Sequence, residues 1–280
     1  MPARSTILAT LRHALIWLVI LGLWEGAYRV IGWRPWIFPA PSHVIDSMLG
    51  MLNVHTAFGD EFHSGWPKPL EAGHVPGGLV VACMVSAIRL AIGFALSIAL
   101  GGLLGMAMWR FQALDDFLGP FLLGLQTLPS VCWVPLGIVT FGLNERGVMF
   151  VLVMGSFSAI AIALRDGLRT MPPLYRRAGL MLGATGWKLY RHVLLPASLP
   201  AFATSLRQGF SFAWRSLLGA ELIFSVVNHG LGFLLQNARE IGGPSDVIAV
   251  MIVMIMIGML ADRWFFAKLQ RSINTRFGLG

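Results

Sequence analysis

Charged side chains inside long apolar runs are the residues of this 280-residue chain that could do chemistry. Glu25, Arg89 and Glu221 each stand in such a run. At the hydrocarbon level of a membrane, a charge costs about 2.5–3.5 kcal/mol unless water or a partner receives it. Arg89 is therefore expected to face the protein interior. It is either a contact for an anionic solute or a structural bond to a carbonyl group or to Glu221.

Neutral polar side chains lie beside helix breaks in the apolar run 117–141. Three prolines interrupt this run: Pro120, Pro129 and Pro135. A proline frees a backbone carbonyl group, which must find a partner inside the protein or in a wet cavity. We therefore interpret Gln126, Thr127 and Ser130, together with Arg89 and Glu221, as candidates for lining a solute pathway.

Motifs for catalysis are absent from the sequence. It has no phosphate-binding loop ending in Lys-Ser or Lys-Thr, no His-Glu-x-x-His helix and no Gly-x-Ser-x-Gly elbow. The chain therefore lacks the catalytic cluster that a membrane enzyme would need. We expect no catalytic residue and no cofactor in it. If transport here is driven by ATP, a separate subunit must hydrolyse it.

Metal binding is not expected either. His55, His63 and His74 lie near Asp60 and Glu61, but no pair has the i, i+4 spacing of a helical metal site, so we interpret the segment as a solvated loop. The two cysteines, Cys83 and Cys132, both lie in apolar runs and indicate neither a disulfide nor a metal-ligand pair.

The composition is that of an integral membrane protein. Hydrophobic residues make up 56% of the chain, charged residues 12%, and the mean hydropathy is +0.72, whereas about a quarter of the residues in an ordinary soluble domain are charged. The net charge of +8 comes from basic residues at the ends of apolar runs, so it reports membrane topology rather than binding of nucleic acid.

The sequence predicts an all-α fold with about six transmembrane helices. Basic residues favour a cytoplasmic side for both termini and for the longest basic segment. The first apolar run lacks a cleavage site and is followed by Trp33 and Trp36, so we interpret it as a retained span. The predicted spans are residues 14–31, 77–109, 117–141, 147–164, 201–227 and 247–264.

We expect four regions along the chain. Residues 1–32 form the cytoplasmic N-terminal end with the first span, and 33–75 a periplasmic loop with a short amphipathic helix. Residues 76–265 form a core of five spans, and 266–280 a cytoplasmic tail. The core contains a cytoplasmic segment, residues 165–200, which we call the coupling loop.

Small residues recur every four positions in the second span, at Gly93, Ser97, Gly101 and Gly105. This spacing places them on one helix face, which lacks bulky side chains. The pattern predicts that another helix packs closely there.

The coupling loop has the pattern of a docking surface. From Arg165 to His192, six basic residues against one acid leave a charge of +5, which favours the cytoplasmic side. Helical spacing interrupted by Gly183 and Gly186 predicts a helix, a turn and a second helix. We expect Pro196 and Pro200 to close this segment.

Part of this loop resembles the signature loop of the permease subunits of bacterial ATP-binding-cassette (ABC) importers. That signature is Glu-Ala-Ala, three residues, Gly and a distant Leu-Pro. The matching residues are Ala178, Gly179, Gly183, Ala184, Leu195 and Pro196. The sequence departs from the pattern at Arg177, which stands where the family has an acid, and at Gly179, which stands for Ala.

Other segments resemble the nitrate-, sulfonate- and taurine-type permeases. They are Phe38-Pro39-Ala40-Pro41-Ser42, Ala220-Glu221, Gly230-Leu231-Gly232 and Asn237-Ala238-Arg239. The resemblance implies a type I ABC importer permease fold in the bacterial inner membrane. It also implies that the chain carries a small anionic solute and works as a homodimer.

The resemblance implies the partners as well. The chain would bind ABC ATPase subunits, which hold ATP and Mg, through Arg177 and the six matching residues of the coupling loop. A periplasmic binding protein would deliver the solute. The alternative is a self-contained secondary transporter or channel that uses Glu25, Arg89 and Glu221 for coupling or selectivity.

Overall fold

The computed structural model describes residues 2–34, 37–52, 78–224, 229–240 and 243–276, and within these ranges the chain forms helices and no strands. The described chain falls into two compact units, 1–82 with 234–253 and 83–233 with 254–280. The histidines at 55, 63 and 74, and most of the expected periplasmic loop, lie outside the described residues.

In the first unit, α1 (Pro2–Ile31) packs against α2 (Pro41–Met51) through aromatic rings. The rings of Tyr28 and His43 lie 5.5 Å apart, edge to face. The Glu25 carboxylate accepts hydrogen bonds from the backbone N–H and the hydroxyl group of Ser42, at 3.4 and 3.3 Å, and forms an ion pair with Arg29 at 2.8 Å. A negative charge is favoured at a helix N-terminus, so Glu25 stabilises the start of α2.

The same unit contains the start of α11 (Pro244–Leu260). The carboxylate of Asp246 accepts from the backbone N–H of Gly243 at 3.1 Å and from the hydroxyl group of Ser47 on α2. Ser47 and Asp246 are both buried. An acid that reaches back to the N–H group at the helix start supplies one half of a capping box, and here it also ties α2 to α11.

The second unit holds most of the long helices. Their bounds are α3 (Gly78–Arg110, from residue 83 on), α4 (Gln112–Thr127), a 3₁₀ turn (Ser130–Trp133), α5 (Val134–Phe141), α6 (Glu145–Arg169), α7 (Pro173–Met181), α8 (Gly186–Leu189), a π-helical segment (Tyr190–Leu194), α9 (Leu195–Ile223), the start of α10 (Leu231–Glu240), the end of α11 with a second π-helical segment (Ala261–Phe266), and α12 (Ala267–Arg276).

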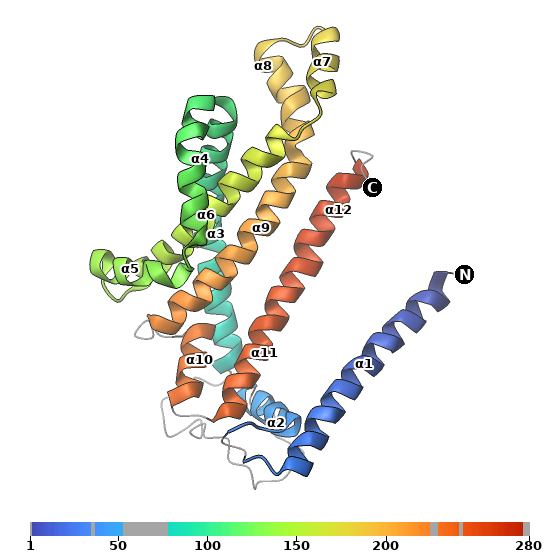
Figure 1. Ribbon diagram of the computed structural model, residues 1–280, viewed down its shortest axis with the longest axis vertical. Coiled ribbons are helices and arrows are strands. Elements are labelled where there is room, and N and C mark those ends of the chain that lie inside the picture. Colours follow the sequence, from blue (N-terminus) through green and yellow to red (C-terminus); the bar gives the residue numbers. More distant parts are fainter. Residues whose placement is uncertain (1, 35–36, 53–77, 225–228, 241–242, 277–280) are drawn as a thin grey trace. The chain divides into compact units, whose positions relative to one another are not determined.

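Helices α6 and α9 lie side by side along most of their lengths (Figure 1). Their glycines allow the approach. A Cβ atom on Gly167 would lie 2.5 Å from Cβ of Ala201, and one on Gly155 would lie 2.8 Å from Cβ of Ser216. Real Cβ atoms do not come this close, so a larger residue at either position would force the two helices apart.

The small-residue face of α3 lies against α6. A Cβ atom on Gly105 would come within 2.6 Å of the carbonyl oxygen of Ala161, and Ser97 accepts a hydrogen bond from the hydroxyl group of Ser156 at 2.7 Å. Gly93 and Gly101 face the same helix, through Leu152 and Ile160. The structure thus places all four residues of the predicted packing face at a helix contact.

The other side of α3 is exposed and apolar. Its large exposed side chains in this unit are Met84, Ile88, Ile92, Leu96, Leu100, Leu103 and Met106. They recur every three or four residues, so they form one stripe along the helix. An exposed stripe without polar groups on a helix long enough to span a bilayer is what contact with lipid requires.

Three helical stretches in the described residues are long and apolar enough to cross a membrane: Leu79–Arg110, Glu145–Arg169 and Pro244–Ile273. A fourth candidate is the pair Gln112–Thr127 and Ser130–Phe141, bent by 102°. The break falls at Pro129, where proline removes a donor. The chain is therefore an all-helical multi-pass membrane protein, and the count of six spans stays a prediction.

The expectation that Pro196 and Pro200 end the helical segment is wrong. Helix α9 begins at Leu195, with Pro196 in its first turn and Pro200 inside it, and runs to Ile223. Proline is tolerated in the first turn because the N–H group it lacks would have no partner within the helix there. At the other end of the chain, helical structure continues past the expected span end at 264 to Arg276.

Candidate functional site

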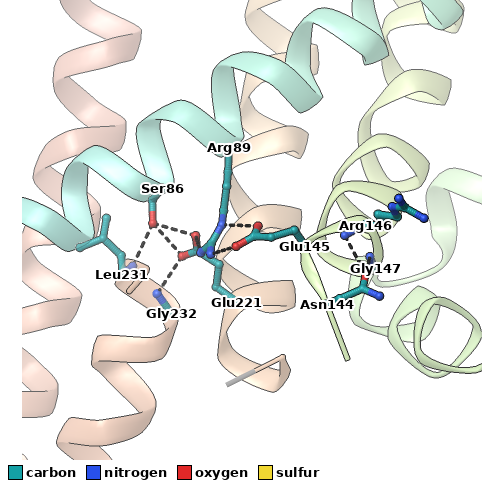
Figure 2. Close-up of polar contacts among 9 residues, drawn as sticks. All are labelled: Ser86, Arg89, Asn144, Glu145, Arg146, Gly147, Glu221, Leu231 and Gly232. Atoms are coloured by element: carbon teal, nitrogen blue, oxygen red, sulfur yellow. Dashed lines mark hydrogen bonds and ion pairs between the residues drawn. The ribbon is translucent and has the colours of Figure 1, made fainter. Parts of the chain in front are cut away.

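A buried ionic cluster surrounds Arg89 on α3 (Figure 2). Its guanidinium group donates to Glu145 at the first residue of α6, with Nε at 2.8 Å from Oε2, and to Oε1 of Glu221 on α9 at 2.9 Å. The side chains of Arg89 and Glu221 are 5% and 1% exposed, whereas that of Glu145 is 55% exposed. The cluster therefore joins three helices and leaves one carboxylate reaching the surface.

Glu221 also holds the start of α10. Its Oε2 accepts from the backbone N–H of Gly232 at 3.0 Å, and Ser86 Oγ donates to the same carboxylate at 2.7 Å while accepting from the backbone N–H of Leu231 at 2.9 Å. A Cβ atom on Gly230 would lie 2.5 Å from the Glu221 carboxylate. The Gly-Leu-Gly sequence thus opens the space that this carboxylate fills.

In the structure Arg89 pairs with Glu221, which is the structural bond that the sequence analysis gave as one of two alternatives for Arg89. One arginine between two glutamates leaves this cluster with a formal charge of −1. A contact between Arg89 and an anionic solute would have to compete with both carboxylates. That role for Arg89 and Glu221 stays a prediction.

Two of the three polar residues predicted beside the proline break, Gln126 and Ser130, lie close to α6. Gln126 Nε2 donates to the carbonyl oxygen of Ser158 at 3.2 Å, and Thr127 Oγ1 donates back to Gly124 O in its own helix at 2.7 Å. The Cβ atom of Ser130 lies 3.2 Å from the position that a Cβ atom on Gly155 would take. The break between α4 and α5 therefore packs against the middle of α6.

Helix α9 carries an exposed stripe that the sequence analysis missed. Between residues 200 and 222, its exposed residues are Thr204, Gln208, Ser211 and Arg215, and all four are polar. Their spacings of four, three and four place them on one face. Helix α3 shows the opposite pattern, an exposed face that is apolar throughout. The stripe on α9 cannot face lipid at low cost, so it faces water or another protein surface.

A groove of about 530 Å³ adjoins the N-terminal part of this stripe. Its lining includes Thr204 and Gln208 of α9, Asp166 of α6, Thr170 just after α6, and Tyr175 of α7. The groove thus leads from the polar face of α9 toward the coupling loop.

The coupling loop is a compact helical hairpin at one end of α6 and α9 (Figure 1). The backbone N–H of Ala184 donates to Gly179 O and that of Gly183 to Leu180 O, both at 3.0 Å, and Gly183 has φ of +77°. This is the Schellman pattern that ends a helix with a left-handed glycine. Gly183 therefore shapes the turn after α7.

Glycine at 179 also has a structural reason. Gly179 is buried, and a Cβ atom there would lie 2.6 Å from Leu189 Cδ1 and 3.1 Å from Val193 Cγ2. Helix α7 therefore packs tightly on the helix that leads into α9. Arg177 and Ala178 are exposed, and Ala184 and Pro196 are half-buried. Leu195 is the first residue of α9.

Large apolar side chains project from this hairpin, two of them at its turn and one at the start of α7. Leu174 is 71% exposed, Met181 88% and Leu182 86%. Arg176 and Arg177 lie on the same short helix and are exposed as well. Apolar side chains rimmed by polar ones mark a protein interaction surface. We call Leu174, Met181 and Leu182 the apolar tip.

An ionic network joins the end of α6, just before the hairpin, to α4. Asp115, whose side chain is 6% exposed, accepts from Arg165 NH1 at 2.9 Å and pairs with Arg169 NH2 at 2.5 Å. Arg165 also pairs with Asp166 at 2.8 Å. The two arginines of α6 balance the charge of Asp115.

Residues 97–273 match the protein family described as binding-protein-dependent transport system inner membrane component. The chain is 34% identical over 187 residues to a putative ABC transporter permease protein of Methanocaldococcus jannaschii, which covers 67% of this chain and 70% of the relative. It is 30% identical over 204 residues to a bicarbonate transport system permease protein of Synechococcus elongatus, with 73% of each covered.

A nitrate import permease protein of Synechocystis is 29% identical over 205 residues, with 72% of each chain covered. Among solved structures, a chain of the inward-facing MetNI methionine ABC transporter superposes with a TM-score of 0.60 at 16% identity, covering 74% of this chain and 99% of that one. A chain of an amino acid ABC transporter gives 0.57 at 15% identity, covering 70% and 94%. These likenesses show a type I ABC importer permease fold.

Proposed function

The chain belongs to the family of binding-protein-dependent transport system inner membrane components, and we propose that two copies of it form the pathway of an importer for a small oxyanion. It is a permease, a transport subunit of an ABC importer. The identity of the solute, the pairing of two copies and the ATPase contact are parts of the proposal.

The coupling loop is the observation that carries this function. It presents the apolar tip, with a basic rim, on a hairpin shaped by a Schellman turn, and the Asp115 ion pairs join the preceding end of α6 to α4. A surface of this kind serves docking better than contact with water. The partner that we propose is an ABC ATPase subunit, which would hold ATP and Mg.

The helix after the hairpin supplies a route for coupling. Helical structure continues from Gly186 through the π-helical segment into α9 and ends at Ile223. A movement of the docked hairpin would therefore be transmitted along one continuous helix to the polar stripe. Transport needs two discrete arrangements, and the nucleotide state of the ATPase would bias them through this contact.

The orientation follows from charge. The basic coupling loop and the basic C-terminal residues favour the cytoplasmic side, so we propose an inner-membrane protein with both termini in the cytoplasm. A periplasmic binding protein would then deliver the solute to the opposite side. The cluster of Arg89, Glu145 and Glu221, near the start of α6 and the end of α9, would lie toward that side.

The class of solute is drawn from the relatives. Their names assign bicarbonate to one permease and nitrate to another. Both are small oxyanions, and sulfonates share the same charge and acceptor oxygens. We propose this chemical class for the chain.

The competing function is a self-contained secondary transporter. The charges assigned to its coupling, Glu25, Arg89 and Glu221, are each bonded to neighbouring groups, so each would first have to release its partner. Reconstitution of the permease with its ATPase and binding protein in liposomes separates the two. The importer predicts uptake of nitrate, bicarbonate or methanesulfonate only with ATP inside. Uptake driven by an ion gradient without ATP would contradict it.

A further inference from the structure

Arg215 lies at mid-span on the polar stripe of α9. Its neighbour Ser216 faces Gly155, close to the midpoint of α6 (Glu145–Arg169). Its other neighbour, Trp214, has Nε1 3.0 Å from the position of a Cβ atom on Gly258, midway along the candidate span Pro244–Ile273. Two independent contacts thus place Arg215 near the centre of the membrane-crossing part of this unit.

The side chain of Arg215 is exposed and held in a defined position. Its Nε donates to Ser211 O at 3.0 Å, and its guanidinium carbon lies 4.8 Å from the centre of the Phe212 ring. Both contacts are within its own helix. Within the described part of the chain, the terminal nitrogens of Arg215 have no carboxylate partner.

Three other arginines in the helices of this unit differ in this respect. Arg89 pairs with Glu221, Arg165 with Asp115, and Arg207 with Asp262. In each case an acid of the same chain balances the buried or half-buried charge. An unbalanced charge at mid-span is costly, so Arg215 needs an anion or water on the exposed face of α9.

The same unit of a second copy does not offer this anion from its described residues. The carboxylates described in this unit are each bonded to another arginine or lie near a helix end: Asp115, Asp116, Glu145, Asp166, Glu221 and Asp262. A planar guanidinium group with free donors matches the oxygens of an oxyanion. The helix break at Ser130 adjoins Gly155, the contact of Ser216, so neutral hydrogen-bonding groups are close to the same level.

We propose that Arg215 is the anion-binding residue of the translocation pathway and that it selects small oxyanions at mid-membrane. This rests on the proposed function. Ser211, Gln208 and Thr204 continue the polar path along α9 toward the groove and the cytoplasm. A solute held by Arg215 would leave along these neutral side chains, which bind anions more weakly than a guanidinium group does.

The test uses the permease with its ATPase and binding protein in liposomes and measures ATP-dependent uptake of nitrate, bicarbonate and methanesulfonate. Loss of a charged hydrogen-bond donor predicts a fall of about tenfold to a hundredfold for Arg215→Gln. Arg215→Lys restores part of the rate. Arg110→Gln is the matched control, because Arg110 also lies over the ring of its neighbour, Phe111, but at the end of α3.

Assembly and thermal stability are measured on the same variants. Arg215→Gln is expected to assemble with the ATPase subunits as the wild type does and to have the same thermal midpoint. Wild-type uptake at an unchanged rate in Arg215→Gln would overturn the assignment. Loss of assembly or stability would overturn it too, because Arg215 would then bind protein instead of solute. Absence of ATP-dependent uptake by the wild type would instead refute the proposed function.

Discussion

Glu221 and Gly230 approach each other so closely that a Cβ atom on Gly230 would lie 2.5 Å from the carboxylate carbon of Glu221. This contact lets the carboxylate reach the first turn of α10 while it also holds Arg89. We therefore predict that Gly230→Ala displaces the carboxylate and lowers the free energy of unfolding by about 1–3 kcal/mol, as overpacking does. A lower thermal midpoint of the purified protein would show this.

Gly124→Ala is the control for that change. A Cβ atom on Gly124, inside α4, would meet nothing within 4 Å, so its thermal midpoint is expected to equal or exceed that of the wild type. An equal fall of the thermal midpoint in both variants would contradict the prediction that the contact with Glu221 destabilises Gly230→Ala.

A second prediction concerns Arg89 and Glu221 as a buried pair. Arg89→Ala leaves two carboxylates without their cation, and removal of one partner from a buried ion pair costs about 3–5 kcal/mol. In the double variant with Glu221→Gln, the loss is expected to be smaller than the sum of the two single losses. Thermal unfolding of the three variants measures this coupling, and strictly additive losses would contradict the ion pair.

A third prediction concerns the polar stripe. With Cys83 and Cys132 replaced by Ala, we expect Gln208→Cys and Ser211→Cys to react with a sulfonate-bearing thiosulfonate reagent, because only a wet surface supports the reactive thiolate. Ile92→Cys, on the exposed apolar face of α3, is the control and stays unmodified. Equal protection at all three positions would place the stripe in a dry environment.

A fourth prediction concerns the anchor of the coupling loop. Asp115→Asn removes the carboxylate that Arg165 and Arg169 share, and we expect a loss of about 3 kcal/mol because the acid is nearly buried. Its neighbour Asp116 is exposed and accepts only from Gln112 at 3.4 Å. Asp116→Asn is therefore expected to stay within about 0.5 kcal/mol of the wild type. Similar thermal shifts for both variants would rule out a special role for Asp115.

Much of the helical layout follows from the sequence because long apolar runs between charged ends leave few alternatives. The run 77–109 corresponds to α3 (Gly78–Arg110), and Gly183 marks the turn between α7 and α8. The start of α9 was missed because proline was taken as a terminator, although the first turn of a helix accepts it.

The Glu145 partner of Arg89 could not be predicted, although Glu221 was among the partners that the sequence analysis named. Glu145 lies 56 residues from Arg89, and nothing in the local pattern around Glu145 points to a buried arginine. The stripe of Thr204, Gln208, Ser211 and Arg215 was readable from its spacing. Its exposure, however, depends on which face of α9 packs against α6, and only the fold settles that.

Docking of an ATPase on the coupling loop is the central claim, and affinity purification of the tagged permease from its native membrane tests it most directly. We predict that an active ATPase copurifies with the wild type and is lost when Met181→Asp and Leu182→Asp are combined, because both side chains are almost fully exposed. Gly183→Asn is the control, because asparagine tolerates the left-handed turn, and it is expected to retain the ATPase. A wild type that purifies without any ATPase, or a double variant that keeps it in full amount, would contradict the account.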